Sequence, residues 1–132
     1  MTIVAMDHVA LTVKDLEATC AFYDRLFGVV THAELVVEGR ALARQIRMGG
    51  AMLSIHQQGN GIDLVAQAPV PGAGDFCFQW GGTIQSAIDL LSAHGIAVIA
   101  GPAPRVNVNG VPSQSVYFRD PDANLVELMA PD

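Results

Sequence analysis

The stretch Asp7–Gly28, DHVALTVKDLEATCAFYDRLFG, predicts a strand, a capped helix and a stop in direct succession. Side chains alternate across a strand, so one face of the first segment is apolar and the other carries His8 and Thr12. Asp15 is a suitable N-cap for the helix, and Gly28 can adopt the left-handed conformation that follows a last helical turn. The stretch therefore predicts one strand–helix unit with defined ends.

Residues 75–95 repeat this pattern at an offset of 67 residues. At this offset Asp75 corresponds to His8, Phe78 to Leu11 and Gly95 to Gly28. A match of strand, cap, helix and stop at one offset indicates a duplicated module. Each copy is followed by further apolar runs with turn residues between them, so the sequence predicts two β-α-β-β-β modules, residues 1–57 and 75–132, joined by linker 58–74 within a single domain, 1–132.

The closing strands of the second module are less regular than those of the first. IAVIA (96–100), SQSVYFR (113–119) and LVELM (125–129) read as strands. The segment GPAPRVNVNGVP (101–112) reads as an irregular excursion, and DPDAN (120–124) as a tight turn. The expected fold class is α+β.

Composition limits the classes of function. At 132 residues with 51% hydrophobic content, the chain has enough material for one packed core. A net charge of −6 without a basic run makes nucleic acid an unfavourable partner, and no apolar run approaches the length of a membrane span. Cys20 and Cys77 read as small buried side chains rather than a disulfide, which suits a cytoplasmic protein.

Four strands carry side chains that can bind a metal ion on their less apolar faces. By alternation, Ser54 and His56 lie opposite Leu53 and Ile55 in residues 51–57. The same argument places His8, Asp75 and Glu127 on such faces, and these residue types in combination suit Fe, Mn, Co, Ni or Zn in the divalent state.

Each of these residues also has a structural interpretation that the sequence leaves open. Asp75 suits a strand start, where its carboxylate accepts hydrogen bonds from nearby backbone N–H groups. His56 can be an imidazole facing solvent at a strand end. Tyr117 and Arg119 share a strand face and can contact an anionic or carbonyl substrate, although an arginine at a strand end is equally often solvated.

Three segments, DHVALTVKDLEATCAFYDRLFG, GDFCFQW and YFRDPDANLVEL, resemble the vicinal oxygen chelate superfamily of glyoxalases, bleomycin resistance proteins and dioxygenases. The string MLSIHQQG, followed by PVPGAGDFCF, resembles its small glyoxalase-like branch. The resemblance implies a glyoxalase-like fold whose curled mixed sheets form a metal-binding cup. It transfers His8 and Glu127 onto metal-ligand positions. Asp75 stands where many members have histidine, and Ser54 where glyoxalase I has glutamate, so His56 is the expected third ligand and Asp75 the alternative.

The resemblance also implies a function. We expect a divalent-metal-dependent enzyme of the lyase or isomerase type, acting on a small oxygen-chelating substrate by Lewis-acid stabilisation of an enediolate or oxyanion. Glu127 would be both ligand and catalytic base, with Tyr117, Arg119 and Thr12 as substrate contacts. The alternative is a metal-free protein that sequesters a drug or metabolite, as bleomycin resistance proteins do; an extradiol dioxygenase is disfavoured because ring-cleaving members usually need an additional pair of modules. A homodimer is expected, with the cup formed either inside one chain or across two.

Overall fold

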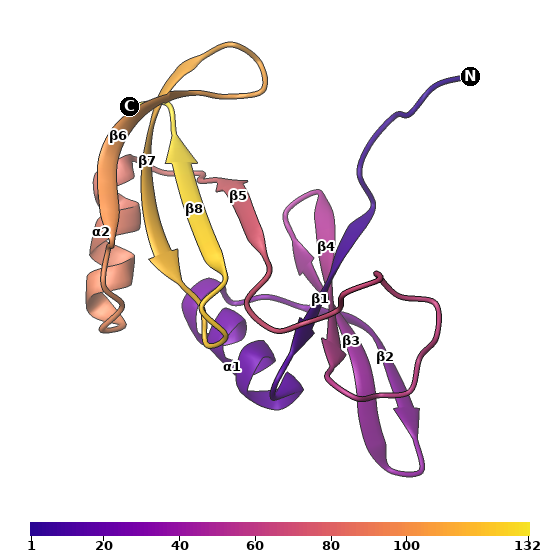
Figure 1. Cartoon of the computed structure of the whole chain (residues 1–132). Helices are drawn as coiled ribbons and strands as arrows, with labels where there is room; N and C mark the ends of the chain where they lie inside the picture. The colour runs from indigo at the N-terminus through magenta and orange to yellow at the C-terminus, as the bar shows by residue number, and fades with distance from the viewer. The chain divides into compact units, whose positions relative to one another are not determined.

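The computed structural model describes residues 1–132, which divide into two units, Met1–Ala73 and Gly74–Asp132. Each unit consists of a four-stranded sheet and one helix, whose labels can be followed in Figure 1. The first unit contains β1 (His8–Val13), α1 (Leu16–Phe27), β2 (Thr31–Val37), β3 (Arg40–Met48) and β4 (Ala51–Gln57). The second contains β5 (Asp75–Gln79), α2 (Ile84–Ala93), β6 (Ala100–Val106), β7 (Pro112–Arg119) and β8 (Leu125–Ala130).

The two sheets have the same topology. Their strand orders are β1-β4-β3-β2 and β5-β8-β7-β6, so the first strand of each unit lies beside the last. This pair, which includes one edge strand, is parallel in both sheets, and the other pairs are antiparallel. The predicted α+β class with two β-α-β-β-β modules is therefore confirmed.

The helix ends are formed by the residues that the sequence indicated. The Asp15 side chain accepts a hydrogen bond from the Ala18 backbone N–H at 3.1 Å, and Gly28 ends α1 with a φ of 63°. In α2, Thr83 accepts from the Ser86 backbone N–H at 3.1 Å, and Gly95 follows the helix with a φ of 68°. These caps satisfy backbone groups that a helix terminus leaves without partners.

Each helix covers the apolar face of its own sheet. In the first unit, α1 packs on β3 and β4, and the core includes Leu11, Val13, Leu16, Tyr23, Leu53 and Ile55. In the second unit, α2 packs on β7 and β8, and the core includes Ala87, Leu91, Val116, Phe118, Val126 and Leu128. Since alternate side chains point away from the helix, the opposite face of each sheet carries the polar residues.

The sequence-based assignment of residues 96–106 was wrong. Residues 96–99 form no strand, and β6 begins at Ala100 and extends to Val106, into the segment that was expected to be irregular, whereas residues 107–111 form no strand, as expected. Pro102 and Pro104 are tolerated because β6 is the edge strand of its sheet, where a missing N–H leaves no neighbouring strand unpaired. Gly101 is required there, since a Cβ at this position would lie 2.2 Å from the Ser115 carbonyl oxygen.

Candidate functional site

The polar face of the first sheet carries His8, Thr12 and His56. In the parallel β1–β4 pair, Ala10 lies beside Ser54 and Thr12 beside His56. Paired residues in register point to the same side of a sheet, so these side chains share the face that α1 does not cover. The strand register agrees with the facing that alternation predicted for them.

His8 is oriented by its neighbour in the chain. Its Nδ1 lies 2.7 Å from Oδ1 of Asp7, and 46% of the His8 side chain is exposed. Because a carboxylate accepts hydrogen bonds, this contact places the hydrogen of the neutral imidazole on Nδ1, and in that form Nε2 is the lone-pair nitrogen. Metal-binding histidines are commonly oriented by such a carboxylate contact. His8 therefore has the chemistry of a metal ligand that binds through Nε2.

His56 is held between two polar side chains. Its Nε2 lies 3.3 Å from Ser54 Oγ, and its Nδ1 lies 3.5 Å from Asn60 Nδ2. Burial lowers the pKa of His56 below its usual range, and the nearby His8 lowers it further. Both effects favour the neutral imidazole, which is the form that binds metal ions.

The polar face of the second sheet carries a row of three side chains from adjacent strands. Glu127 on β8 lies beside Cys77 on β5 and beside Tyr117 on β7. The Glu127 Oε1 atom is buried and has no hydrogen-bond partner. A buried carboxylate oxygen without a partner is energetically costly, so it suggests a site that a ligand or ion completes.

Cys77 lies next to this carboxylate and differs from the sequence-based expectation of a buried side chain, because the residue is exposed. Partial desolvation of the thiol, the charge and hydrogen bonding of Glu127, and the charge of Asp75 together raise the pKa of Cys77 to about 12. The thiol is therefore protonated at neutral pH and is a poor nucleophile there. Both cysteines are free, as the sequence predicted.

The remaining predicted residues of the second unit occupy the ends of strands. Asp75 begins β5 beside Leu125 and is exposed. Arg119 ends β7, is exposed, and donates from Nη1 to the Ala123 carbonyl oxygen at 3.3 Å. Both positions are compatible with the structural interpretations that the sequence left open for these residues.

Arg105 is a polar residue of this face that the sequence reasoning missed. Its Nε donates to the Tyr117 hydroxyl at 2.9 Å, and its guanidinium carbon lies 5.6 Å from the centroid of the Tyr117 ring. It was missed because residues 101–112 were expected to be irregular, whereas β6 pairs Arg105 with Ser113. The alternation of Arg105 and Asn107 with Val106 and Val108 was the signal that could have revealed it.

The predicted metal ligands are divided between the units. His8 and His56 lie in Met1–Ala73, whereas Asp75 and Glu127 lie in Gly74–Asp132. No group of three or more His, Cys, Asp and Glu side chains that could hold a metal ion is found. Each unit thus offers part of the expected ligand set on its polar sheet face.

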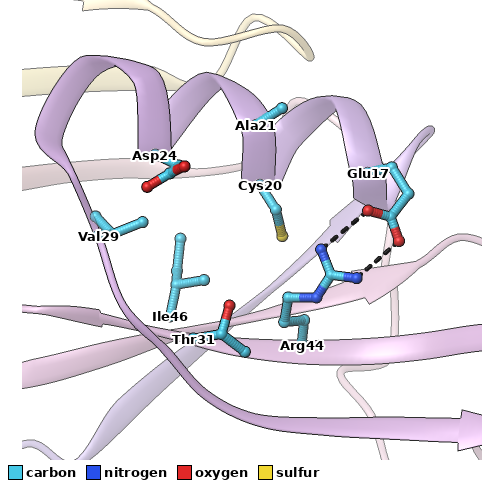
Figure 2. A pocket seen from close by; sticks show the side chains of 8 residues that line it. All are labelled: Glu17, Cys20, Ala21, Asp24, Val29, Thr31, Arg44 and Ile46. Carbon is cyan, nitrogen blue, oxygen red and sulfur yellow. Dashed lines mark hydrogen bonds and ion pairs between the residues drawn. The ribbon is translucent and has the colours of Figure 1, made fainter.

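A separate pocket of about 240 Å³ lies on the helix side of the first sheet (Figure 2). It is lined by Glu17, Cys20, Ala21, Asp24, Val29, Thr31, Arg44 and Ile46. Arg44 closes one side, where its guanidinium binds both carboxylate oxygens of Glu17 at 2.7 and 3.1 Å and also contacts Glu34.

Figure 2 shows the Cys20 sulfur pointing from α1 toward the sheet, and burial raises the pKa of this thiol. Because Arg44 and Ile46 pair with the buried Ile55 and Leu53, this pocket lies on the opposite face of the sheet from His8.

Neither α1 nor α2 is long and apolar enough to cross a membrane.

Comparison with known proteins identifies the family. Residues 5–128 match the model of the Glyoxalase/Bleomycin resistance protein/Dioxygenase superfamily. The chain belongs to this superfamily. The predicted resemblance is thereby confirmed over nearly the whole sequence.

Three proteins illustrate what this chain is similar to. The glyoxalase domain-containing protein RDO1 of Mycosarcoma maydis is 36% identical over 129 residues, which cover 97% of this chain and 69% of that protein. The crystal structure of virulence protein STM3117 from Salmonella typhimurium has a TM-score of 0.85 at 30% identity and covers 98% of each chain. A lactoylglutathione lyase from Agrobacterium tumefaciens has a TM-score of 0.71 at 28% identity, covering 98% of this chain and 96% of that one.

Proposed function

We propose that this superfamily member is a divalent-metal-dependent enzyme of the lyase or isomerase type that acts on a small oxygen-chelating substrate. The observation that carries the proposal is the buried, unpartnered Oε1 of Glu127 on the polar face of its sheet. The similarity to a lactoylglutathione lyase, at 28% identity, supports the class of reaction.

Two of the residues present have donor atoms that suit a metal ion. His8 would bind through Nε2, because Asp7 engages Nδ1. Glu127 would bind through its unpartnered oxygen. His56 is proposed as the third ligand, since its imidazole is kept neutral, and Asp75 is the alternative. When bound, a divalent metal supplies Lewis-acid polarisation of substrate oxygens.

The protein's own groups would then handle the substrate and the proton. Glu127 is proposed as the base that accepts a proton from the carbon next to the polarised carbonyl and returns it. Cys77 beside it remains a neutral thiol at neutral pH, so we assign it no nucleophilic role. Tyr117 and Thr12 present hydroxyl groups on the polar faces of their sheets and are proposed substrate contacts, with Arg119 at the end of β7.

Metal content tests the proposal directly. Protein purified without chelators is expected to contain a divalent metal, and His8→Ala and Glu127→Ala should each lose most of it. His94→Ala, at the end of α2, is the matched histidine control and should keep the metal. Full metal content in both site variants would overturn the assignment.

A competition assay separates the candidates for the third ligand. If His56 binds the metal, His56→Ala should weaken affinity at least about tenfold against a chromophoric chelator, while Asp75→Asn should cost less. Equal affinities for wild type and His56→Ala would remove His56 from the ligand set.

A metal-free protein that sequesters a drug or metabolite is the second candidate. It is supported by the description of the matching superfamily, which includes bleomycin resistance proteins. Wild-type protein that takes up no divalent metal after dialysis against Fe, Mn, Co, Ni or Zn would support this function over the enzyme.

A further inference from the structure

The edge strand β6 brings a guanidinium to the polar face of the second sheet. Arg105 pairs in register with Ser113, two strand positions before Ser115 and four before Tyr117. Its side chain reaches along the face to Tyr117, whose hydroxyl accepts from Arg105 Nε at 2.9 Å. Tyr117 in turn lies beside Glu127, so a cation and the proposed catalytic carboxylate occupy one face with a phenol between them.

Arg105 is held in place without an acidic partner. Its Nη1 donates to the Pro104 carbonyl oxygen at 2.7 Å, and its guanidinium carbon lies 5.6 Å from the Tyr117 ring centroid. The ion pairs of the chain involve other residues, including Arg44, which binds two carboxylates. The hydrogen bonds of Arg105 thus use Nε and Nη1 and position the guanidinium while leaving its positive charge uncompensated.

A positioned and uncompensated guanidinium is suited to binding an anion. Its planar set of N–H donors matches the two oxygens of a carboxylate. Tyr117 restricts the rotamers of Arg105, so less conformational entropy is lost on binding than for a freely moving side chain. Arg119 lacks this arrangement, since its side chain makes a 3.3 Å hydrogen bond to the Ala123 carbonyl oxygen and is not held by an aromatic ring.

We propose that Arg105, positioned by Tyr117, binds a carboxylate group of the substrate, and that the small molecule acted on by this protein is therefore a carboxylic acid. This inference rests on the proposed function, because it assigns a substrate class to the same polar face. It moves the anion-binding role from Arg119, which the sequence suggested, to Arg105. Tyr117 acts as a positioning residue for the guanidinium.

The test follows the arginine Nε–Hε signals by NMR in metal-free protein titrated with succinate at constant ionic strength. The Arg105 signal, assigned by its loss in Arg105→Gln, is expected to shift saturably, with an affinity about tenfold higher than at Arg119. Succinamide, which has a similar shape and no charge, should produce no such shift. Tyr117→Phe should weaken succinate binding at Arg105, whereas Arg40→Gln, at the start of β3 in the first unit, should leave it unchanged.

The outcomes are distinct from those of the metal experiments. Equal responses of Arg105 and Arg119, or an equal response to succinamide, would overturn the carboxylate site even if the protein holds a metal. Unchanged binding in Tyr117→Phe would overturn the positioning role. If the protein takes up no metal but the Arg105 signal still shifts saturably, the result would support the carboxylate site. Only the proposal of a metal-dependent enzyme would then be overturned.

Discussion

At the scale of single residues, neighbouring strands set the chemistry of the polar faces. Cys77 is exposed, yet its pKa is raised to about 12, because partial desolvation and the adjacent Glu127 both disfavour the thiolate. His56 shows the opposite direction, since burial and His8 disfavour the charged imidazole. In both cases the neutral form is favoured, first by burial and then by the charge of a residue distant in sequence.

Cys77 is therefore expected to alkylate slowly despite its exposure. A rise in pKa from 9.0 to about 12 lowers the thiolate fraction near pH 8 by about 1000-fold. Iodoacetamide rates measured by mass spectrometry against pH, in a Cys20→Ala background, check this. Glu127→Gln should raise the rate because it removes the negative charge, and Asp89→Asn on α2 is the control. A rate that rises with a midpoint near 9 would contradict the prediction.

His56 is expected to make stability depend on pH in the weakly acidic range. Because its pKa is lowered in the folded protein, the unfolded chain binds more protons below the usual value of 6.5. The free energy of unfolding should thus fall as pH drops through this range, and denaturant titrations with a chelator present would measure it. His56→Gln should reduce the slope and His94→Gln should not. Identical slopes for wild type and His56→Gln would contradict the assignment.

At the scale of elements, the turn 120–124 does more than reverse the chain. Asn124 is 1% exposed and donates from Nδ2 to Asp120 Oδ2 at 2.9 Å. Its Oδ1 accepts from the Gly74 backbone N–H at 2.7 Å, just before β5 begins. The turn between β7 and β8 therefore also fixes the start of the strand that carries Cys77.

Asn124→Ala is expected to lower the free energy of unfolding by about 2 kcal/mol, since it removes the hydrogen bonds that the buried Asn124 side chain makes with Asp120 and with the Gly74 backbone N–H. Asn109→Ala, in the exposed loop before β7, is the matched control and should change stability by less than about 0.5 kcal/mol. Urea unfolding followed by circular dichroism measures both. Equal effects of the two substitutions would show that the turn network contributes little.

At the scale of the whole molecule, exposed apolar side chains favour self-association. The edge strand β2 exposes Leu35, Val36 and Val37 by 46%, 49% and 47%. Unlike β6, it contains no proline that would discourage pairing with another strand. We therefore expect a homodimer, as the sequence also suggested.

Light scattering at micromolar concentration is expected to give twice the mass of one chain. The dimer should persist at raised salt, because burial of apolar surface is not screened as surface charge is. A mass equal to one chain across a dilution series would contradict the dimer.

The sequence by itself determined both helices and every strand except β6, and it determined which side chains of β1, β4 and β8 point away from the core. Period-two alternation identified the polar sides of β1, β4 and β8, while caps and glycines marked both helices, because these signals depend on local backbone geometry alone. The 67-residue repeat predicted the shared topology, and the family motifs were sufficient to indicate the superfamily. The sequence analysis failed at β6, where the prolines are acceptable only because the strand lies at a sheet edge.

Tertiary structure alone decided which side chains meet across strands. Register placed Cys77 and Tyr117 on either side of Glu127, and the reach of Arg105 to Tyr117 followed from the pairing of β6 with β7. Burial left Glu127 Oε1 without a partner and shifted the pKa of Cys77 and of His56. These properties depend on strand pairing and desolvation, which bring together residues far apart in the chain, so local sequence patterns carry no direct signal for them.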